Sequence, residues 1–348
     1  MNMYDYVKET PEVLKYIISE RKKIFKPLVE KISEKSFDEI VFIGSGTSNN
    51  AAVTAKYFIE KVLNVKVRCE FPNLFKNYEN ILNKNALYIA ISQTGQSRLT
   101  YEALSKVKEM NLINFSITSD LNSSISKLSD VSLDMSCGEE KVIYRTKGYS
   151  STLIDLYLLA LELGLTQGKI SDKDYKEYVE NLEEISNNFD KLIDISKKWY
   201  EDNKQALISR NNIFIIGTGP NLGTAIEGSL KIVETVKCVT NNYELEEYMH
   251  GPQNALSDEA CMFIIESEDE SKTKSQILDK YLKTKISCSY LVGKEGDIKL
   301  PCVGNKYFSA LELVIPFQVI SHCLSIDKGI DLAKKRFPDF DEFVGKKI

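Results

Sequence analysis

Two short segments rich in glycine and hydroxyl side chains could bind a phosphate. The first, V-F-I-G-S-G-T-S-N-N-A-A, runs from Val41 to Ala52, and the second, I-A-I-S-Q-T-G-Q-S, runs from Ile89 to Ser97. In each, an apolar run ends in Gly, Ser and Thr where a helix should begin, so backbone N–H groups and hydroxyls can converge on one anion. Neither carries the G-x-G-x-x-G dinucleotide fingerprint or the G-K-[ST] of a P-loop. Together the two segments favour a sugar phosphate over a nucleotide.

The second half of the chain holds side chains that could move protons. In A-I-E-G-S-L-K-I-V-E, the residues Glu227, Lys231 and Glu234 are spaced so that on a helix they share one face. His250, one of only two histidines, follows in Y-M-H-G-P-Q. A carboxylate and an imidazole in one pocket can move protons between adjacent sugar carbons and open a pyranose ring. The alternative interpretation is a solvated salt-bridge face followed by a loop histidine.

An internal repeat relates the two halves of the chain. A shift of about 173 residues places Phe42–Gly46 over Ile215–Gly219 and brings Ile89–Ser92 close to Phe263–Glu266. Two features superpose at once, which indicates a duplicated α/β unit.

The halves differ where the second hydroxyl-rich segment lies. The first half carries Ser92–Ser97, whereas the corresponding part of the second half is the acidic run Glu266–Glu270. An anionic loop would repel a phosphate. We therefore expect only the N-terminal half to bind it.

Short apolar runs alternate with helical patterns in both halves, which is typical of an α/β fold with parallel sheets and helices on both faces. The expected strands are Glu39–Gly44, Val65–Glu70, Ala86–Ser92, Asn114–Ser119, Asn212–Gly217, Met262–Ser267 and Ser287–Val292. A charged stretch with apolar residues at three- and four-residue spacing, Ser171–Arg210, is expected to be a linking helix. The expected domains are residues 1–170, the helix over 171–210, and residues 211–348.

The composition is that of a globular protein long enough for two cores, with 348 residues, 43% hydrophobic and 27% charged. A net charge of −5 and dispersed basic residues argue against a nucleic-acid partner. Seven cysteines are scattered singly, which indicates neither a disulfide framework nor a metal site and fits a cytoplasmic protein. The N-terminus has no signal-peptide pattern. The longest apolar stretch, Phe308–Ile326, is interrupted by polar residues and proline, so we expect a buried helix pair or a subunit contact rather than a membrane span.

As a set, these motifs resemble the double sugar isomerase (SIS) domain family over nearly the full length. The chain is similar to the isomerase half of glucosamine-6-phosphate synthase and to the fructosamine-6-phosphate deglycases. The segments that carry the resemblance are Y-D-Y-V-K-E-T-P-E, G-T-S, S-Q-T-G-Q-S, R-T-K-G-Y-S-S-T-L (Arg145–Leu153), A-I-E-G-S-L-K-I-V-E and H-G-P. The resemblance implies two tandem flavodoxin-like, three-layer α/β/α subdomains.

The resemblance also implies roles for single residues. The sugar phosphate would be bound by Thr47, Ser48, Ser92, Gln93, Thr94 and Ser97. Glu234 would be the base that moves the C1/C2 proton, with Glu227 and Lys231 supporting it. His250 would assist ring opening, reaching into the neighbouring subunit's pocket of a homodimer. No metal or organic cofactor is needed for this chemistry.

Two departures from the family pattern limit what can be transferred. The sequence starts with the isomerase-like half, without a glutaminase domain or N-terminal nucleophilic cysteine, so we expect no glutamine-dependent synthesis by this chain alone. The synthases end in a tail whose lysine reaches the sugar, and Lys346 is a candidate for that role here, although a packed or disordered tail would explain the same sequence.

The leading hypothesis is a cytoplasmic enzyme acting on a 6-phosphorylated hexose or amino sugar through an enediol or enolamine. The sequence leaves open an isomerase, a deaminase or a deglycase that splits a fructosamine 6-phosphate. The alternative is a non-catalytic sugar-phosphate sensor, which would have no chemical need for Glu234 together with His250.

Overall fold

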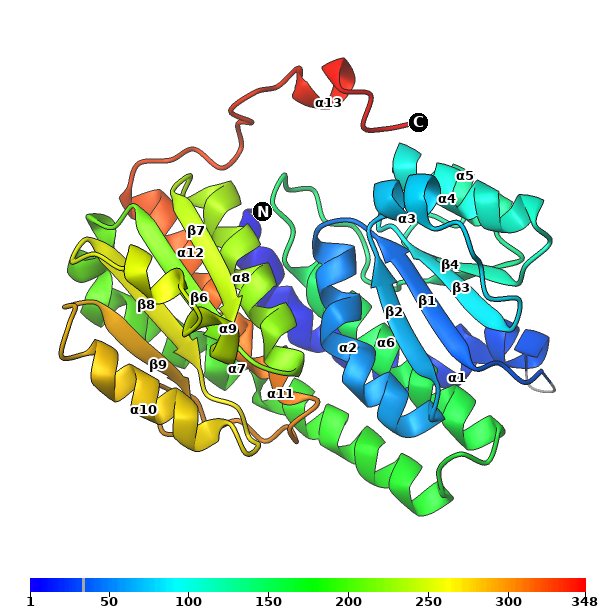
Figure 1. Cartoon of the computed structure of the whole chain (residues 1–348), viewed down its shortest axis with the longest axis horizontal. Coiled ribbons are helices and arrows are strands. Elements are labelled where there is room, and N and C mark those ends of the chain that lie inside the picture. Colours follow the sequence, from blue (N-terminus) through cyan, green and yellow to red (C-terminus); the bar gives the residue numbers. More distant parts are fainter. Residues whose placement is uncertain (33–34) are drawn as a thin grey trace. The chain divides into compact units, whose positions relative to one another are not determined.

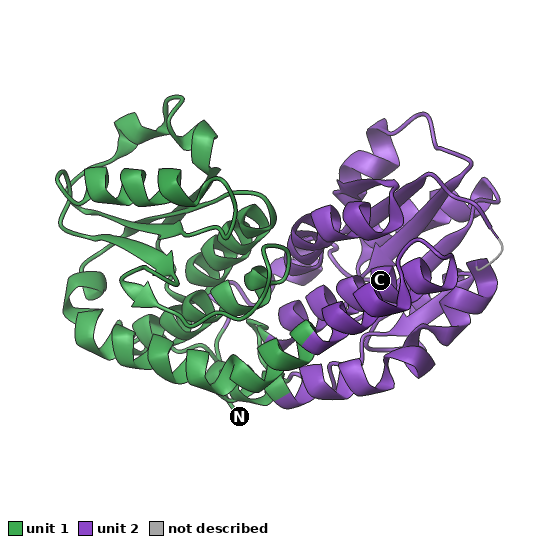
Figure 2. Ribbon diagram, turned by 90° about the horizontal axis from the view of Figure 1, so that it is seen from below, with its two compact units in different colours: residues 1–11, 141–146, 181–334 green, residues 12–140, 147–180, 335–348 purple. Residues whose placement is uncertain are grey.

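The computed structural model describes residues 1–32 and 35–348, and within them ten strands form two five-stranded parallel sheets. The chain divides into two compact units, and each unit holds one sheet (Figure 1). Figure 2 colours them: unit 1 is Met1–Pro11, Lys141–Thr146 and Asn181–Lys334, and unit 2 is Glu12–Glu140, Lys147–Glu180 and Lys335–Ile348. Helices α1 (Met3–Ile32) and α7 (Asp172–Ile208) carry residues of both units.

The sheet of unit 2 has the strand order β2-β1-β3-β4-β5. Its elements are β1 (Glu39–Gly44), α2 (Thr47–Leu63), β2 (Lys66–Glu70), α3 (Pro72–Tyr78), β3 (Ala86–Ile91), α4 (Arg98–Glu109), β4 (Asn114–Thr118), α5 (Ser124–Leu128), β5 (Val131–Asp134) and α6 (Lys147–Thr166). All residues of β1 and β3 are buried. On one face, Val41 and Ile43 pack with Phe75 of α3 and Val107 of α4. Both faces of a parallel sheet are covered by its crossover helices, which explains the uninterrupted apolar runs.

The sheet of unit 1 has the order β10-β9-β8-β6-β7. Its elements are β6 (Asn212–Gly217), α8 (Pro220–Thr235), β7 (Val239–Glu244), α9 (Leu245–Tyr248), the 3₁₀ turn η1 (Pro252–Ala255), β8 (Ala260–Ile265), α10 (Lys272–Leu282), β9 (Ser289–Gly293), β10 (Ile298–Lys299), α11 (Ser309–Leu313) and α12 (Ile315–Asp327). The C-terminal tail, which belongs to unit 2, ends with α13 (Phe340–Phe343).

The two sheets share one topology, which confirms the internal repeat. In each, the first strand in sequence lies between the second and the third, the flavodoxin-like order. Gly46 and Gly219, which the repeat superposes, precede their helices with nearly the same backbone angles: φ 56° and ψ −131° for Gly46, φ 55° and ψ −131° for Gly219. The duplication therefore extends to the backbone of the turn after the first strand.

The expected strands all form, with shifts of one or two residues at several ends. The strand expected at Met262–Ser267 begins and ends two residues earlier, at Ala260–Ile265. The sequence analysis missed β5, β7 and β10. Strand β7, V-T-N-N-Y-E, lies at a sheet edge with no fully buried residue, so it lacks the apolar run that reveals a central strand. The expected helix over Ser171–Arg210 is confirmed as α7.

The apolar stretch near the C-terminus forms the buried helix pair α11 and α12. Ser309–Asp327 is apolar and long enough to cross a membrane, but 83% of its most apolar window is buried inside the protein. Glu312 within it accepts hydrogen bonds from the backbone N–H groups of Val303 (3.0 Å) and Gly304 (2.8 Å). His322 stacks on Tyr4, with ring centroids 5.7 Å apart. These helices belong to the core of unit 1.

We expect Gly95→Ala to destabilise unit 2 more than Gly168→Ala. Both glycines have a left-handed backbone, with φ +63° and +65°, but a Cβ on Gly95 would lie 1.9 Å from Ser123 Oγ, whereas Gly168 has open space. The backbone alone should cost about 1 kcal/mol in each variant, and overpacking should add about 1–3 kcal/mol at Gly95. Urea unfolding checks this. Equal free energies of unfolding in the two variants would contradict the clash.

Candidate functional site

The two hydroxyl-rich segments begin at neighbouring points of the unit 2 sheet. Strands β1 and β3 pair in parallel up to Gly44 and Ile91, and the segments follow directly after these two residues. The strand order reverses between β1 and β3, and such a switch point at the carboxyl ends of the strands is where open α/β sheets bind ligands. The sheet thus brings the two predicted phosphate loops together.

The first loop leads into the N-terminus of α2. No side chain caps this helix. The first i to i−4 hydrogen bond of the helix runs from the N–H of Asn50 to Gly46 O (2.9 Å), so the N–H groups before Asn50 have no such partner within the helix. Thr47 and Ser48 are half-buried there. A helix of 17 residues also directs the positive end of its dipole at this point.

The second loop is a tight turn that leads into α4. The N–H of Gly95 donates to Ser92 O (3.0 Å), and Thr100 Oγ1 lies 3.0 Å from Ser97 Oγ. Ser92 is buried, whereas Thr94 and Ser97 are half-buried. All six residues expected to bind phosphate therefore lie on two adjacent loops of unit 2, and their role stays a prediction.

The end of the chain lies against the second loop, which the sequence analysis did not anticipate. Arg98 N donates to Lys346 O (3.2 Å), Ile348 N donates to Gln96 O (3.1 Å), and Ser97 and Lys347 form an antiparallel bridge. The ammonium of Lys346, the lysine proposed from sequence, lies 3.4 Å from Asp341 Oδ1 and is largely exposed. Because these contacts are made by the backbone, no side-chain motif could have revealed them.

Two carboxylates lie beside the equivalent loops of unit 1: Glu244, the last residue of β7, and Asp269. Thr218 Oγ1 donates to Glu244 Oε1 (2.6 Å), and Asp269 Oδ2 lies 4.0 Å from where a Cβ on Gly219 would stand. Burial opposes ionisation of Glu244, but hydrogen bonds from Thr218 and from backbone N–H groups outweigh it, so its pKa lies below the usual value. The acidic run itself is partly neutralised, since Lys294 pairs with Glu268 (3.2 Å). The expected repulsion of phosphate from unit 1 stays a prediction, and Glu244 and Asp269 are the carboxylates nearest to the loop after β6.

The predicted proton-transfer residues Glu227, Lys231 and Glu234 meet on α8. Lys231 Nζ lies 2.8 Å from Glu234 Oε2 and 3.5 Å from Glu227 Oε1. The side chains of Glu227 and Lys231 are 0% and 3% exposed, whereas that of Glu234 is 32% exposed. The buried ammonium therefore holds one carboxylate in the core and one at the surface. This arrangement rules out the solvated salt-bridge face.

His250 is not part of this cluster. It lies in an exposed turn after α9, where its backbone N–H donates to Glu247 O (3.1 Å). Among residues 1–32 and 35–348, no hydrogen bond of its side chain is formed within unit 1. The expectation that His250 serves a neighbouring subunit stays a prediction.

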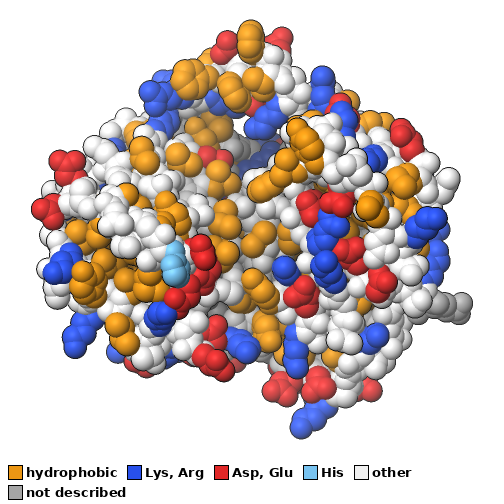
Figure 3. All heavy atoms as spheres, in the orientation of Figure 1, with side chains coloured by type: hydrophobic (Ala, Val, Ile, Leu, Met, Phe, Trp, Pro, Cys, Tyr) orange, Lys and Arg blue, Asp and Glu red, His pale blue; other side chains and the backbone are white. Residues whose placement is uncertain are grey.

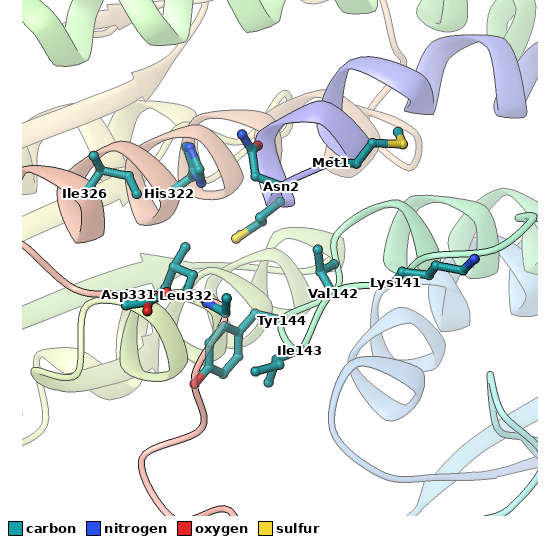
Figure 4. Close-up of a pocket in the computed structure, with 12 residues that line it drawn as sticks. Met1, Asn2, Lys141, Val142, Ile143, Tyr144, His322, Ile326, Asp331 and Leu332 are labelled. Atoms are coloured by element: carbon teal, nitrogen blue, oxygen red, sulfur yellow. Dashed lines mark hydrogen bonds between the residues drawn. The ribbon is translucent and has the colours of Figure 1, made fainter.

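Unit 1 also contains a cavity of about 540 Å³ that the sequence analysis did not anticipate (Figure 4). Its walls come from Met1–Met3, Lys141–Tyr144, α12 and Asp331–Ala333. His322 and Ile326 of α12 lie on one side and Tyr144 on the other (Figure 4). In the part of the chain that the structure describes, this cavity is lined by none of the residues predicted to bind phosphate or to move protons.

Charged side chains of both signs are interspersed on the face of the molecule seen in Figure 3, which shows no broad basic patch. This distribution agrees with the net charge of −5. It gives a polyanionic nucleic acid no evident electrostatic surface on that face.

A comparison of the sequence with protein families finds a known domain. The model of the SIS domain matches residues 32–162 and 206–298, which is more than half of the chain. The chain belongs to the SIS domain family. The first matched segment contains the sheet of unit 2, and the second contains β6 to β9 of the sheet of unit 1 and ends within β10, so each half of the repeat is an SIS domain.

Solved SIS structures resemble this chain over nearly its whole length. A candidate phosphosugar isomerase from Clostridium difficile has a TM-score of 0.91 and 28% identity, covering 100% of this chain and 99% of that one. Glucosamine-6-phosphate deaminase from Thermotoga maritima has a TM-score of 0.75 and 26% identity, covering 94% and 97%.

Among the curated relatives is glutamine–fructose-6-phosphate aminotransferase from Caldanaerobacter subterraneus, 27% identical over 331 residues. The match covers 92% of this chain and 53% of that enzyme. This SIS chain thus spans about half the length of the curated relatives it matches.

We expect Lys231→Met to lower the free energy of unfolding by about 3–5 kcal/mol, because it removes the cation that faces the buried carboxylate of Glu227. The double variant Glu227→Gln/Lys231→Met should recover part of this loss. Lys176→Met is the matched control, since Lys176 pairs with Glu180 at the same i, i+4 spacing (3.7 Å) on an exposed surface and should cost about 0–1 kcal/mol. Chemical denaturation measures all three, and equal losses in the two single variants would contradict a buried ion cluster.

Proposed function

We propose that this SIS protein is an enzyme that moves a proton between C1 and C2 of a 6-phosphorylated sugar or amino sugar. The observation that carries the proposal is the cluster on α8. Glu234 is its only partly exposed member, and Lys231 holds its carboxylate at 2.8 Å. A carboxylate that an ammonium group holds in place and that is also exposed to a ligand can accept a proton from a substrate carbon.

The substrate phosphate is assigned to the two loops of unit 2. Hydroxyls of Thr47, Ser48, Ser92, Thr94 and Ser97, together with the N-termini of α2 and α4, supply hydrogen-bond donors for the phosphate. Beside the corresponding loops of unit 1 lie two carboxylates: Glu244, which ends β7 and accepts from Thr218, and Asp269. This difference supports a single phosphate position for each chain.

The relatives favour an amino sugar within this class. One solved relative is a glucosamine-6-phosphate deaminase, and the curated relatives are glutamine–fructose-6-phosphate aminotransferases. In both names the substrate or product carries nitrogen on a hexose 6-phosphate. We therefore propose a reaction at the C1/C2 positions of such a compound, through an enediol or enolamine, by an isomerase, a deaminase or a deglycase.

In the proposed reaction, each protein group has one task. Glu234 removes the proton from one carbon, carries it as a carboxylic acid and returns it to the next carbon, while Lys231 holds the carboxylate in place before the first step and after the second. During ring opening the C1–ring-oxygen bond breaks: His250, from the second subunit of a homodimer, gives a proton to the ring oxygen, and the anomeric hydroxyl loses one as the carbonyl forms. The free cysteines are consistent with a cytoplasmic enzyme.

Glu234→Gln should strongly reduce turnover of the true substrate. Wild type and variant are incubated with glucosamine 6-phosphate, with fructose 6-phosphate plus ammonium, and with a fructosamine 6-phosphate, and products are identified by mass spectrometry. General-base catalysis predicts a loss of about 10²–10⁴-fold in kcat. Glu180→Gln, a change to an exposed carboxylate that also pairs with a lysine, is the control and should keep full activity. Tight phosphosugar binding without turnover in the wild type would instead establish a sensor.

Mixing two inactive variants tests the shared site. If His250 acts in the partner's site, heterodimers of Glu234→Gln and His250→Asn chains contain one site with both native residues. Mixing equal amounts under exchange conditions should then restore about a quarter of the active sites. Activity that stays at the level of the separate variants would place His250 in the site of its own chain or outside catalysis.

A further inference from the structure

The side-chain amide of Gln93, on the second loop, packs against the start of α6 and makes two long hydrogen bonds within unit 2. Its Nε2 lies 3.5 Å from Glu140 Oε2 and 3.6 Å from Cys137 Sγ. A Cβ on Gly148 would lie 2.6 Å from Gln93 Oε1 and 2.7 Å from Nε2, so the amide rests directly on the Gly148 backbone. Only a glycine leaves room for the amide at this place.

Glu140 is itself fixed by the start of α6. Its Oε1 accepts from Lys147 N and its Oε2 from Gly148 N, both at 3.1 Å. Glu140 is 5% exposed. The N-terminus of a 20-residue helix stabilises a negative charge at this position. The carboxylate therefore has little freedom to turn away from Gln93.

This carboxylate decides which way the amide of Gln93 points. An ionised carboxylate only accepts hydrogen bonds, so it can face the NH₂ group of the amide and not its oxygen. With both N–H groups directed at Glu140 and Cys137, the oxygen is the group left for a ligand; in the described chain, no bond to Gln93 Oε1 is formed within unit 2. Gln93 thus offers an acceptor.

A phosphate dianion is also an acceptor, whereas a sugar hydroxyl can donate. We propose that Gln93 binds a hydroxyl of the sugar rather than its phosphate, and that Glu140 is the positioning residue that fixes this orientation. The inference rests on the proposed function, since it assumes a sugar phosphate on these loops. Under this proposal, five of the six loop residues bind the phosphate, and Gln93 binds a hydroxyl of the sugar.

The test compares two ligands by titration calorimetry, fructose 6-phosphate and inorganic phosphate. Gln93→Ala and Glu140→Ala should each raise the Kd for fructose 6-phosphate about fivefold, the effect of one hydrogen bond. The Kd for inorganic phosphate should stay within about twofold, because backbone and hydroxyl donors remain. The double variant should be no weaker than either single variant, since both changes remove one interaction.

Two further variants separate positioning from folding. Glu140→Gln keeps an oxygen that can accept from Gln93, so it should bind fructose 6-phosphate more tightly than Glu140→Ala. Glu312 in unit 1 is the matched control, because it accepts from two successive backbone N–H groups and from Asn188 Nδ2 (3.3 Å), as Glu140 does from its own partners. Glu312→Ala should lower stability and leave both Kd values unchanged.

The outcomes are distinct. Equal weakening of both ligands by Gln93→Ala would make Gln93 a phosphate ligand and overturn the proposal, as would unchanged binding of both. Additive losses in the double variant would show that Glu140 acts on the ligand by another route. If the wild type bound neither ligand, the proposed phosphosugar site itself would be wrong. The wild-type titrations alone would show this, without the variants.

Discussion

The parallel pairing of β1 with β3 is the contact on which the candidate site depends. It ends at Gly44 and Ile91, where both strands stop and both loops begin. The strands are fully buried, so the hydrophobic effect fixes their register: a slip by one residue would turn their apolar side chains to the wrong faces. The position of hydroxyls that could bind an anion is thus decided by residues that never touch it.

The same backbone in unit 1 shows that the fold alone does not make the site. Gly46 and Gly219 share their backbone angles, and both precede a helix that follows the first strand of its sheet. What differs is the charge beside the helix: hydroxyls in unit 2, and the carboxylates of Glu244 and Asp269 in unit 1. Duplication supplied two helix N-termini, and the side chains around each one determine whether an anion is favoured there.

The sequence predicted the parts of the structure that depend on local pattern. The central strands, α7 and the face shared by Glu227, Lys231 and Glu234 follow from apolar runs and from helical spacing, and all are present. Strand β7 was missed because an edge strand needs no apolar run. The C-terminal tail contacts Gln96 and Arg98 through backbone groups. Glu140 contacts Gln93 through a single long hydrogen bond. Both contacts join residues that are distant in sequence. The spacing of apolar residues along the sequence does not predict such contacts.

Burial explains why similar carboxylates in this protein have different tasks. Glu312 is buried, it accepts hydrogen bonds from two backbone N–H groups of the loop before α11 and from Asn188, and burial raises its pKa. Glu227 is equally buried but faces an ammonium instead. Glu234 shares that ammonium while keeping about a third of its side chain exposed. A group that exchanges protons with a substrate must be both held and reachable, and of these three carboxylates only Glu234 meets both conditions.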